Sequence, residues 1–239
     1  MKDRADKILA DLKLVSSRSQ AKSLIEKGDV TVDGHVLKKA SELISPSAKI
    51  EIHVPLFVGR GAFKLEKALE AFQIDVSNLV MLDVGASTGG FTEILLMKDA
   101  AKVYAIDVGH DQLAAKLKLN PKVINLEGTN IKDLESLPEL ADGAVMDLSF
   151  ISITKVLRQV KNLLRPKAFL MALVKPQFEA GVERLPKDGV VKDDLVREQI
   201  LNEVIVFATT NGWSHHQTIL SPIQGKSGNV EYLVYFIRL

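Results

Sequence analysis

The fold of this chain can be inferred from Val80-Met81-Leu82-Asp83-Val84-Gly85-Ala86-Ser87-Thr88-Gly89-Gly90-Phe91-Thr92. An apolar run that ends in an acid predicts a buried parallel strand. The three glycines predict a turn whose backbone can approach a ligand closely, and the helical pattern that begins at Phe91 brings free N–H groups to the same place. Strand, turn and helix together predict a ligand-binding corner of an α/β fold.

The next predicted strand, residues 102–106, is followed by Asp107, which lies 24 residues after Asp83. A βαβ unit places an acid at about this distance to accept the two hydroxyls of a ribose. The glycine spacing differs from the dinucleotide and P-loop patterns. An acid before the first glycine would repel a pyrophosphate but suits an ammonium group. We therefore predict S-adenosyl-L-methionine as the cofactor; the alternative is a turn of the same shape that binds no ligand.

The composition is that of an ordinary soluble protein with one large or two smaller domains: 239 residues, 46% hydrophobic and 26% charged. The chain has no cysteine, which excludes disulfides and thiolate sites, and its five histidines are scattered, so no metal site is predicted. Residues 1–6 lack the apolar region of a signal peptide, and the longest apolar run, Ala168 to Val174, is far shorter than the ~20 residues of a membrane helix. We expect a cytoplasmic protein without a membrane span.

The first predicted domain, residues 1–54, is small and basic. Residues 1–60 hold 11 Lys and Arg against 8 Asp and Glu, whereas residues 61–239 hold 20 against 22. The pattern predicts a short helix around Ile8, a second helix over residues 18–27 capped by Ser16-Ser17 and ended by Gly28, and a type I′ hairpin at Asp33-Gly34. Strands are expected at 30–32, 35–37 and 49–52.

This domain resembles the S4-like RNA-binding domain, named after ribosomal small-subunit protein four. The matching runs are Arg4-Ala5-Asp6-Lys7, Ser17-Arg18-Ser19-Gln20-Ala21-Lys22-Ser23-Leu24-Ile25 and Gly28-Asp29-Val30-Thr31-Val32-Asp33-Gly34. The resemblance implies that structured RNA is bound through Arg4, Arg18, Gln20 and Lys22, with phosphates and shape recognised rather than base sequence. A solvated basic helix face is the alternative.

After a predicted linker at 55–61, residues 62–239 form the second predicted domain. A helix follows the linker, with Phe63, Leu65, Ala68, Leu69 and Phe72 expected on its apolar side and Lys64 off that stripe. Strands are then expected at 123–126, 143–147, 168–174, 217–220 and 231–237, and helices at 152–164 and 194–210. Repeated βα units that end in a hairpin predict a mainly parallel sheet with an antiparallel edge.

Ligands bind at the carboxyl ends of parallel strands, where this chain places Asp107, Asp147 and Lys175. Lysine directly after an apolar run is unusual, because lysine is rarely buried without a partner. A lysine that is partly desolvated and crowded by a second cation can remove a proton. We predict Lys64 as that cation, with Asp147 and Glu231 orienting the pair. For Lys64 and Glu231, surface salt bridges are the alternative.

The chain resembles TlyA-type proteins, described both as hemolysins and as ribosomal RNA 2′-O-methyltransferases, whose catalytic half is FtsJ-like. The matching runs are 60–66, 83–92, 145–150, 174–179 and 221–231. The resemblance implies a Rossmann-like class I methyltransferase sheet and a catalytic Lys-Asp-Lys-Glu tetrad at Lys64, Asp147, Lys175 and Glu231. It also implies a linker near Arg60 that couples RNA docking to cofactor binding, and Arg60 is itself expected to bind RNA. From the strand-end pattern together with this resemblance, the residues expected to contact the cofactor are Asp83, Gly85, Ser87, Thr88, Gly89, Gly90, Phe91, Asp107, Asn130 and Asp147.

The chain departs from the family pattern at Gly59-Arg60-Gly61-Ala62, at His110-Asp111 and at Gly128, which bears on the RNA substrate more than on the chemistry. We predict that Lys175 removes the proton of a ribose 2′-hydroxyl in ribosomal RNA or a ribosomal subunit, and that Glu231 fixes either Lys64 or the ribose. A membrane-lytic toxin and a non-catalytic RNA-binding protein are the alternatives. The nucleotide, the subunit and the oligomeric state do not follow from the sequence.

Overall fold

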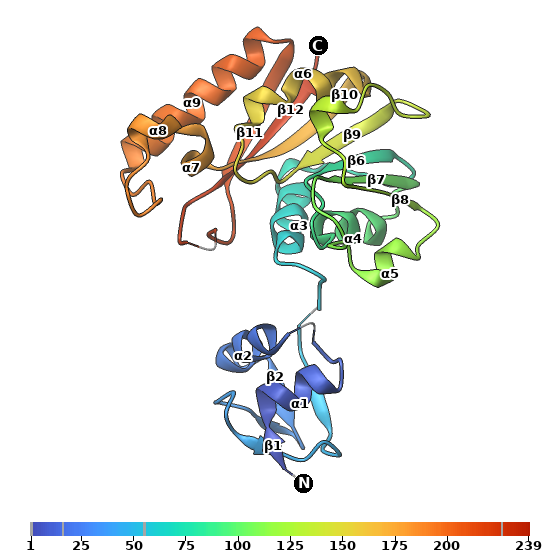
Figure 1. Cartoon of the computed structure of the whole chain (residues 1–239), viewed down its shortest axis with the longest axis vertical. Helices are drawn as coiled ribbons and strands as arrows, with labels where there is room; N and C mark the ends of the chain where they lie inside the picture. The colour runs from blue at the N-terminus through green and yellow to red at the C-terminus, as the bar shows by residue number, and fades with distance from the viewer. Residues whose placement is uncertain (1, 16, 55, 226) are drawn as a thin grey trace. The chain divides into compact units, whose positions relative to one another are not determined.

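The computed structural model describes residues 2–15, 17–54, 56–225 and 227–239 (Figure 1). The chain folds as two compact units, Met1–Phe57 and Val58–Leu239, each with its own hydrophobic core. Four residues of the predictions lie outside the described residues: Met1 of the first predicted domain, Ser16 of the predicted helix cap, Pro55 of the predicted linker, and Lys226 of the second predicted domain.

The first unit combines two helices with short antiparallel strands. Its elements are β1 (Asp3–Arg4), α1 (Ala5–Asp11), α2 (Arg18–Lys27), β2 (Val30–Val32), β3 (His35–Val36), β4 (Leu43–Ile44) and β5 (Ile50–Ile52). Strands β3, β2 and β5 form one sheet in that order, and β1 pairs with β4. The predicted α+β character is confirmed. Strands β1 and β4 were not predicted, because two residues are too few to show an alternating pattern.

The ends of α2 and the hairpin follow the predicted local chemistry. The hydroxyl of Ser17 accepts a hydrogen bond from the backbone N–H of Gln20 at 3.2 Å, and α2 ends at Gly28 with φ +80°. Asp33 and Gly34 both have positive φ, +50° and +80°, as a type I′ turn requires. These caps and this turn are confirmed.

The second unit is built on a seven-stranded sheet with the order β11-β12-β10-β9-β6-β7-β8. The strands are β6 (Val80–Val84), β7 (Lys102–Asp107), β8 (Val123–Glu127), β9 (Ala141–Met146), β10 (Leu164–Val174), β11 (Trp213–Leu220) and β12 (Tyr232–Arg238). Strand β12 runs antiparallel to both neighbours, while β6 to β10 are parallel. The Rossmann-like methyltransferase sheet is confirmed, although the reversed strand lies inside the sheet and β11 forms the edge.

Helices cover both faces of this sheet (Figure 1). On one face, Leu82 and Val84 share a core with Leu157 of α6 (Leu157–Asn162) and Val204 of α9 (Asp194–Thr210). The other face is contacted by α3 (Gly61–Phe72) and α4 (Gly90–Met97). Short helices α5 (Ala115–Lys118), α7 (Pro176–Glu179) and α8 (Gly181–Arg184) complete the unit. The chain reverses its strand order beside β6, and a ligand crevice is expected at the carboxyl ends of the strands there.

Two predictions about local structure were wrong. The helix predicted over 152–164 is a 3-10 turn (Ile153–Lys155) followed by α6, and β10 already begins at Leu164. Strand β10 is irregular between Leu164 and Phe169, which accommodates Pro166, a residue with no N–H for the ladder. The predicted faces of α3 were also wrong at its start, because Phe63 is exposed, and Lys64 is buried.

Candidate active site and RNA-binding face

The predicted ligand corner lies between β6 and α4. Gly85 has φ +87°, and a Cβ there would lie 2.6 Å from the backbone oxygen of Asp147. Gly89 has φ +94° and is the N-cap of α4, where a Cβ would lie 2.2 Å from the tip of the Leu117 side chain. Both positions therefore favour glycine for their conformation, and Gly85 also for space, because the atom that a Cβ would meet there is backbone. The turn brings the end of β6 against the residue that follows β9.

Asp83 lies beneath this turn, fully buried. The Thr92 hydroxyl donates a hydrogen bond to Asp83 Oδ2 at 2.6 Å, while Oδ1 has no partner among the described residues. Burial raises the pKa of Asp83 to about 7, the charge of Asp147 acts in the same direction, and the bond from Thr92 opposes both. A buried carboxylate oxygen without a partner is a place where a cation or hydrogen-bond donor would be stabilised.

Asp107, at the end of β7, holds the next part of the corner together. Its Oδ2 accepts the backbone N–H of Ser87 at 2.8 Å, and its Oδ1 accepts that of Gly109 at 2.7 Å. Its backbone oxygen accepts the N–H of Thr129, the residue directly before Asn130, and this bond holds that segment beside the end of β7. The Asn130 side chain caps a short 3-10 turn by accepting from Lys132 N at 3.1 Å. Asn130 thus lies near the end of β7, but its side-chain oxygen already accepts the hydrogen bond from Lys132.

The four predicted catalytic residues converge from separate elements of the second unit. Lys64 comes from α3, Asp147 directly follows β9, Lys175 directly follows β10, and Glu231 directly precedes β12. Val174 pairs with Tyr232 across the antiparallel strands, so Lys175 and Glu231 lie at the same sheet edge. We call this group the Lys-Asp-Lys-Glu cluster.

The cluster is a chain of ion pairs in which Asp147 contacts both lysines. Lys64 Nζ lies 2.7 Å from Glu231 Oε2 and 3.6 Å from Asp147 Oδ2, and Lys175 Nζ lies 2.6 Å from Asp147 Oδ1. The side chains of Lys64, Lys175 and Glu231 are less than a tenth exposed, and that of Asp147 is 20% exposed. Two ammonium groups and two carboxylates balance formally, which is what burial of four ionised groups requires.

Neighbours of the cluster were not predicted as site residues. Lys175 Nζ donates to the Ser149 hydroxyl at 2.9 Å and lies 5.7 Å from the ring centroid of Phe178. The Phe178 ring in turn packs on Phe150, with centroids 5.1 Å apart. Phe150 is 91% exposed and has φ +66°, an unusual backbone conformation for a large residue. The available signal was an aromatic residue three positions after each of Asp147 and Lys175.

The chain that enters the second unit packs on the ligand corner. The backbone N–H of Val58 donates to Glu93 Oε2 at 2.7 Å, on α4. A Cβ on Gly90 would lie 3.0 Å from Ala62 N, and one on Gly59 would lie 2.5 Å from Thr88 Oγ1. Arg60 is exposed at the start of α3. The entering segment and the glycine turn are therefore in close contact, so that a shift of one would move the other.

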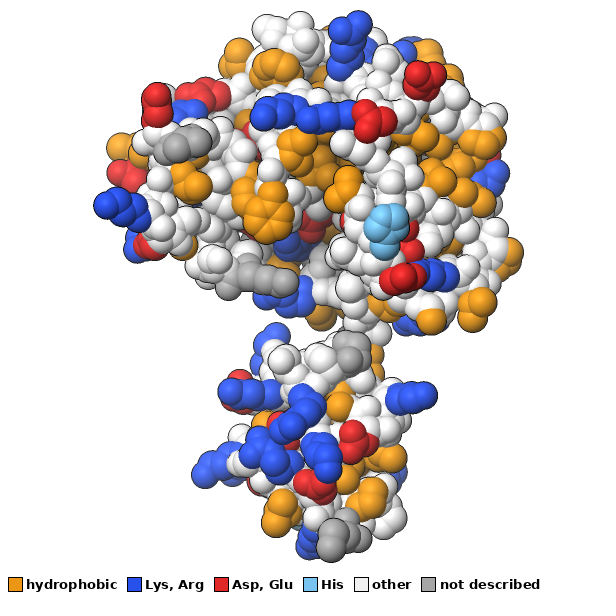
Figure 2. Space-filling view, in the orientation of Figure 1, with side chains coloured by type: hydrophobic (Ala, Val, Ile, Leu, Met, Phe, Trp, Pro, Cys, Tyr) orange, Lys and Arg blue, Asp and Glu red, His pale blue; other side chains and the backbone are white. Residues whose placement is uncertain are grey.

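The predicted RNA-binding residues of the first unit lie on α2 and just before α1. Arg4 and Arg18 are brought together, because both guanidinium groups bind the carboxylate of Asp6. Lys22 is exposed and lies 3.7 Å from Glu26, while Gln20, two residues before Lys22, is half-buried. Figure 2 shows Lys and Arg side chains gathered on the visible face of this unit. Asp6 was not predicted as a site residue.

Comparisons with known proteins match both units. An FtsJ-like methyltransferase model matches residues 57–238, and an S4 domain model matches residues 3–50. The 16S/23S rRNA (cytidine-2′-O)-methyltransferase TlyA of Mycobacterium tuberculosis is 41% identical over 97% of this chain and 88% of that protein. Hemolysin A of Brachyspira hyodysenteriae is 40% identical over 98% and 99%. A solved Streptococcus thermophilus structure that carries the name hemolysin superposes with TM-score 0.78 and 36% identity, covering 99% of this chain and 88% of that one. Within the described residues, no helix has both the length and the apolar character needed to cross a bilayer.

Proposed function

The chain belongs to the FtsJ-like methyltransferase family, and we propose that it methylates ribose 2′-hydroxyls of ribosomal RNA with S-adenosylmethionine as the donor. The observation that carries this proposal is the Lys-Asp-Lys-Glu cluster, buried at the sheet edge where ligands of this fold bind. The S4 domain and the name of the Mycobacterium tuberculosis relative support ribosomal RNA as the substrate. A cytoplasmic location belongs to the same proposal, because ribosomal subunits are found there.

The residues of the ligand corner fit S-adenosylmethionine. Asp83 Oδ1 is a buried acceptor without a partner among the described residues, which suits an ammonium group. Gly85 and Gly89 leave space that a Cβ would fill, and Asp107 is placed for ribose hydroxyls. When bound, S-adenosylmethionine supplies a methyl group on a positively charged sulfur. The acids Asp83 and Asp107, at the ends of two neighbouring strands, offer the corner negative charge.

The cluster then supplies a base for the attacking hydroxyl. In its neutral form, Lys175 Nζ accepts the proton of the 2′-hydroxyl, and Ser149 and Asp147 hold that nitrogen in place. Asp147 also contacts Lys64, whose Nζ is anchored by Glu231, so the four side chains of the cluster are linked to one another. Most of the remaining rate comes from holding the reacting groups in line.

Phe150 gives the proposed site a surface for a nucleobase. Phe150 is 91% exposed, and its ring packs on that of Phe178, whose centroid lies 5.7 Å from Lys175 Nζ. An exposed aromatic ring binds an unstacked base by stacking, at about 1–3 kcal/mol per base. The target nucleotide, once turned out of its helix, would be held there with its ribose toward Lys175.

The experiment is methyl transfer from labelled S-adenosylmethionine to ribosomal subunits purified from cells that lack the gene. The wild-type protein should label one or both subunits. Lys175→Ala should abolish labelling and still bind S-adenosylhomocysteine with wild-type affinity. Full activity of Lys175→Ala would refute its role. RNA binding without any labelling by the wild type would favour the non-catalytic alternative, and leakage of liposomes by protein free of lipopolysaccharide would favour the membrane-lytic one.

A further inference from the structure

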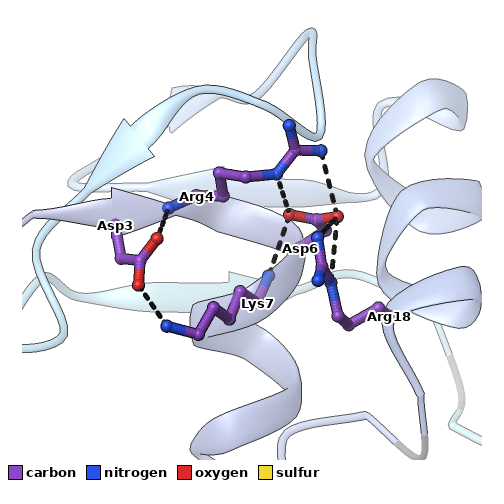
Figure 3. A network of polar contacts seen from close by, with 5 residues as sticks. All are labelled: Asp3, Arg4, Asp6, Lys7 and Arg18. Atoms are coloured by element: carbon purple, nitrogen blue, oxygen red, sulfur yellow. Dashed lines mark hydrogen bonds and ion pairs between the residues drawn. The ribbon is translucent and has the colours of Figure 1, made fainter.

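A buried carboxylate lies inside the basic face of the first unit. Asp6, in the first turn of α1, is 5% exposed. Its oxygens accept Nε and Nη2 of Arg4 at 3.0 and 3.2 Å, and Nη2 and Nε of Arg18 at 2.9 and 3.3 Å (Figure 3). It also accepts the backbone N–H of Lys7 at 3.0 Å. A carboxylate repels phosphates, so its presence at the centre of a surface proposed to bind a polyanion needs a physical explanation.

Asp6 counteracts the repulsion between two positive charges. Two guanidinium groups repel each other, and the carboxylate that both contact holds them in one place. The bonds from Arg4 and then Arg18 lower the pKa of Asp6 to about 2 against the opposing effect of burial, so the carboxylate is ionised at neutral pH. The side chains of Arg4 and Arg18 remain 45% and 54% exposed. Each uses two of its five N–H groups on Asp6, which leaves three that Asp6 does not take.

We propose that Asp6 is a positioning residue for RNA docking: it holds Arg4 and Arg18 as a fixed pair whose outward N–H groups bind backbone phosphates. The inference rests on the proposed function, because it assumes that the first unit binds RNA. Arginine suits this role, since its planar fork can bind a carboxylate on one edge and a phosphate on another. Asp6 therefore strengthens binding to a polyanion although its own charge opposes that binding.

Two effects of removing the Asp6 charge compete. Loss of one negative charge several ångströms from a phosphate strengthens binding by no more than about twofold at physiological salt. Loss of the fixed geometry means that both arginines must be ordered on binding, which weakens it about three- to tenfold. The second effect is the larger, so Asp6→Asn should bind RNA more weakly.

Asp3 offers a matched control on the same short stretch. Its carboxylate accepts from Lys7 Nζ at 2.5 Å and from the backbone N–H of Arg4 at 2.7 Å, and neither guanidinium group is involved (Figure 3). Asp3→Asn therefore removes the same charge without releasing the arginine pair. We expect this variant to bind RNA as the wild type does, or up to about twofold more tightly.

The test measures affinity of the full-length protein for purified small and large ribosomal subunits, with S-adenosylhomocysteine present. Asp6→Asn should bind about three- to tenfold more weakly than Asp3→Asn. The loss caused by Arg18→Ala should be smaller in the Asp6→Asn background than in the wild type. Lys22→Ala should cost the same in both backgrounds, because Lys22 pairs with Glu26 rather than Asp6. A purely structural role for Asp6 would instead weaken the contributions of Arg18 and Lys22 alike.

The outcomes separate this inference from the proposed function. If Arg4→Ala, Arg18→Ala and Lys22→Ala all leave affinity unchanged, the first unit does not dock RNA through this face, and the proposed function loses its RNA-binding part. If they weaken binding while Asp6→Asn equals Asp3→Asn, the positioning role is overturned. Should Asp6→Asn not fold, the double variant Arg4→Lys with Arg18→Lys keeps every charge but loses both forks. Binding about threefold weaker or worse supports the inference, and unchanged binding overturns it.

Discussion

The two units each hold a cluster of ion pairs, and the clusters differ in composition and exposure. In the first unit, two arginines share one carboxylate, leaving a formal excess of positive charge on side chains that are about half exposed. In the second, two lysines are balanced by two carboxylates and almost fully buried. Arginine stays charged and presents a fork to phosphates, whereas lysine can give up its proton in a buried site. The same pairing chemistry thus suits docking in one unit and proton transfer in the other.

The largest effect is expected when a lysine of the buried cluster is replaced by arginine, the cation of the exposed cluster. Lys175→Arg keeps a positive charge beside Asp147 but puts in a group that cannot act as a base. We expect methyl transfer to fall by about 10²–10⁴-fold, as for loss of a general base, while affinity for S-adenosylhomocysteine stays near that of the wild type. Single-turnover rates with saturating ribosomal subunits measure this. A rate within a few fold of wild type would mean that charge at position 175, rather than proton transfer, is what the reaction needs.

Stability should depend on the buried cluster more than on the exposed one. Glu231→Ala leaves Lys64 buried with only the longer contact to Asp147, and breaking a buried pair in this way costs about 3–5 kcal/mol. Chemical denaturation, followed by the fluorescence of Trp213 in the second unit, would report this loss. A change below about 1 kcal/mol would show that water enters the site and screens Lys64.

Cofactor affinity should depend on pH through Asp83. Burial raises the pKa of this carboxyl to about 7, and an ammonium group requires its ionised form. Below pH 7 the carboxyl must lose a proton on binding, so affinity falls as pH falls. Between pH 7 and pH 5.5 we expect S-adenosylhomocysteine to bind about tenfold more weakly. Calorimetry at the two pH values measures it, and Asp83→Asn should bind weakly with no such dependence. An equal pH dependence in that variant would assign the proton to another group.

The smallest effect concerns the stability of the first unit. Arg4→Ala removes a half-exposed partner of Asp6 and leaves Arg18 in place. Exposed pairs contribute about 0–1 kcal/mol, so thermal unfolding should shift little even though RNA affinity falls. A large loss of stability would mean that the arginine pair mainly holds α1 to α2, which would remove the contrast between the two clusters.

The strand-end residues of the site could be predicted because parallel strands bring their carboxyl ends to one edge. Asp83, Asp107, Asp147 and Lys175 needed only the apolar runs that precede them. Lys64 was different: it was predicted as the cation beside Lys175, yet the apolar pattern placed it off the buried face of α3. Ranking by hydrophobicity predicts that Phe63 is buried and Lys64 exposed. The reverse is found, because Lys64 forms ion pairs with Glu231 and Asp147, which lie 167 and 83 residues away in the sequence.

Two other features, the role of Asp6 and the early start of β10, could not be predicted from local sequence patterns. Asp6 resembles any acid in the first turn of a helix, where it favours the dipole, and nothing local shows that two arginines 2 positions before and 12 positions after it share its carboxylate. The early start of β10 was hidden by Pro166, which normally argues against a strand and is tolerated here by an irregular register. Contacts between distant segments decide both features.

In the proposed reaction, a ribose hydroxyl of ribosomal RNA receives the methyl group beside Lys175. The most direct test is mass spectrometry of nucleosides from subunits incubated with the wild-type protein and deuterated S-adenosylmethionine. We predict the label on the ribose of a 2′-O-methylated nucleoside, absent when Lys175→Ala is used. Label on a base, or on protein rather than RNA, would contradict the account.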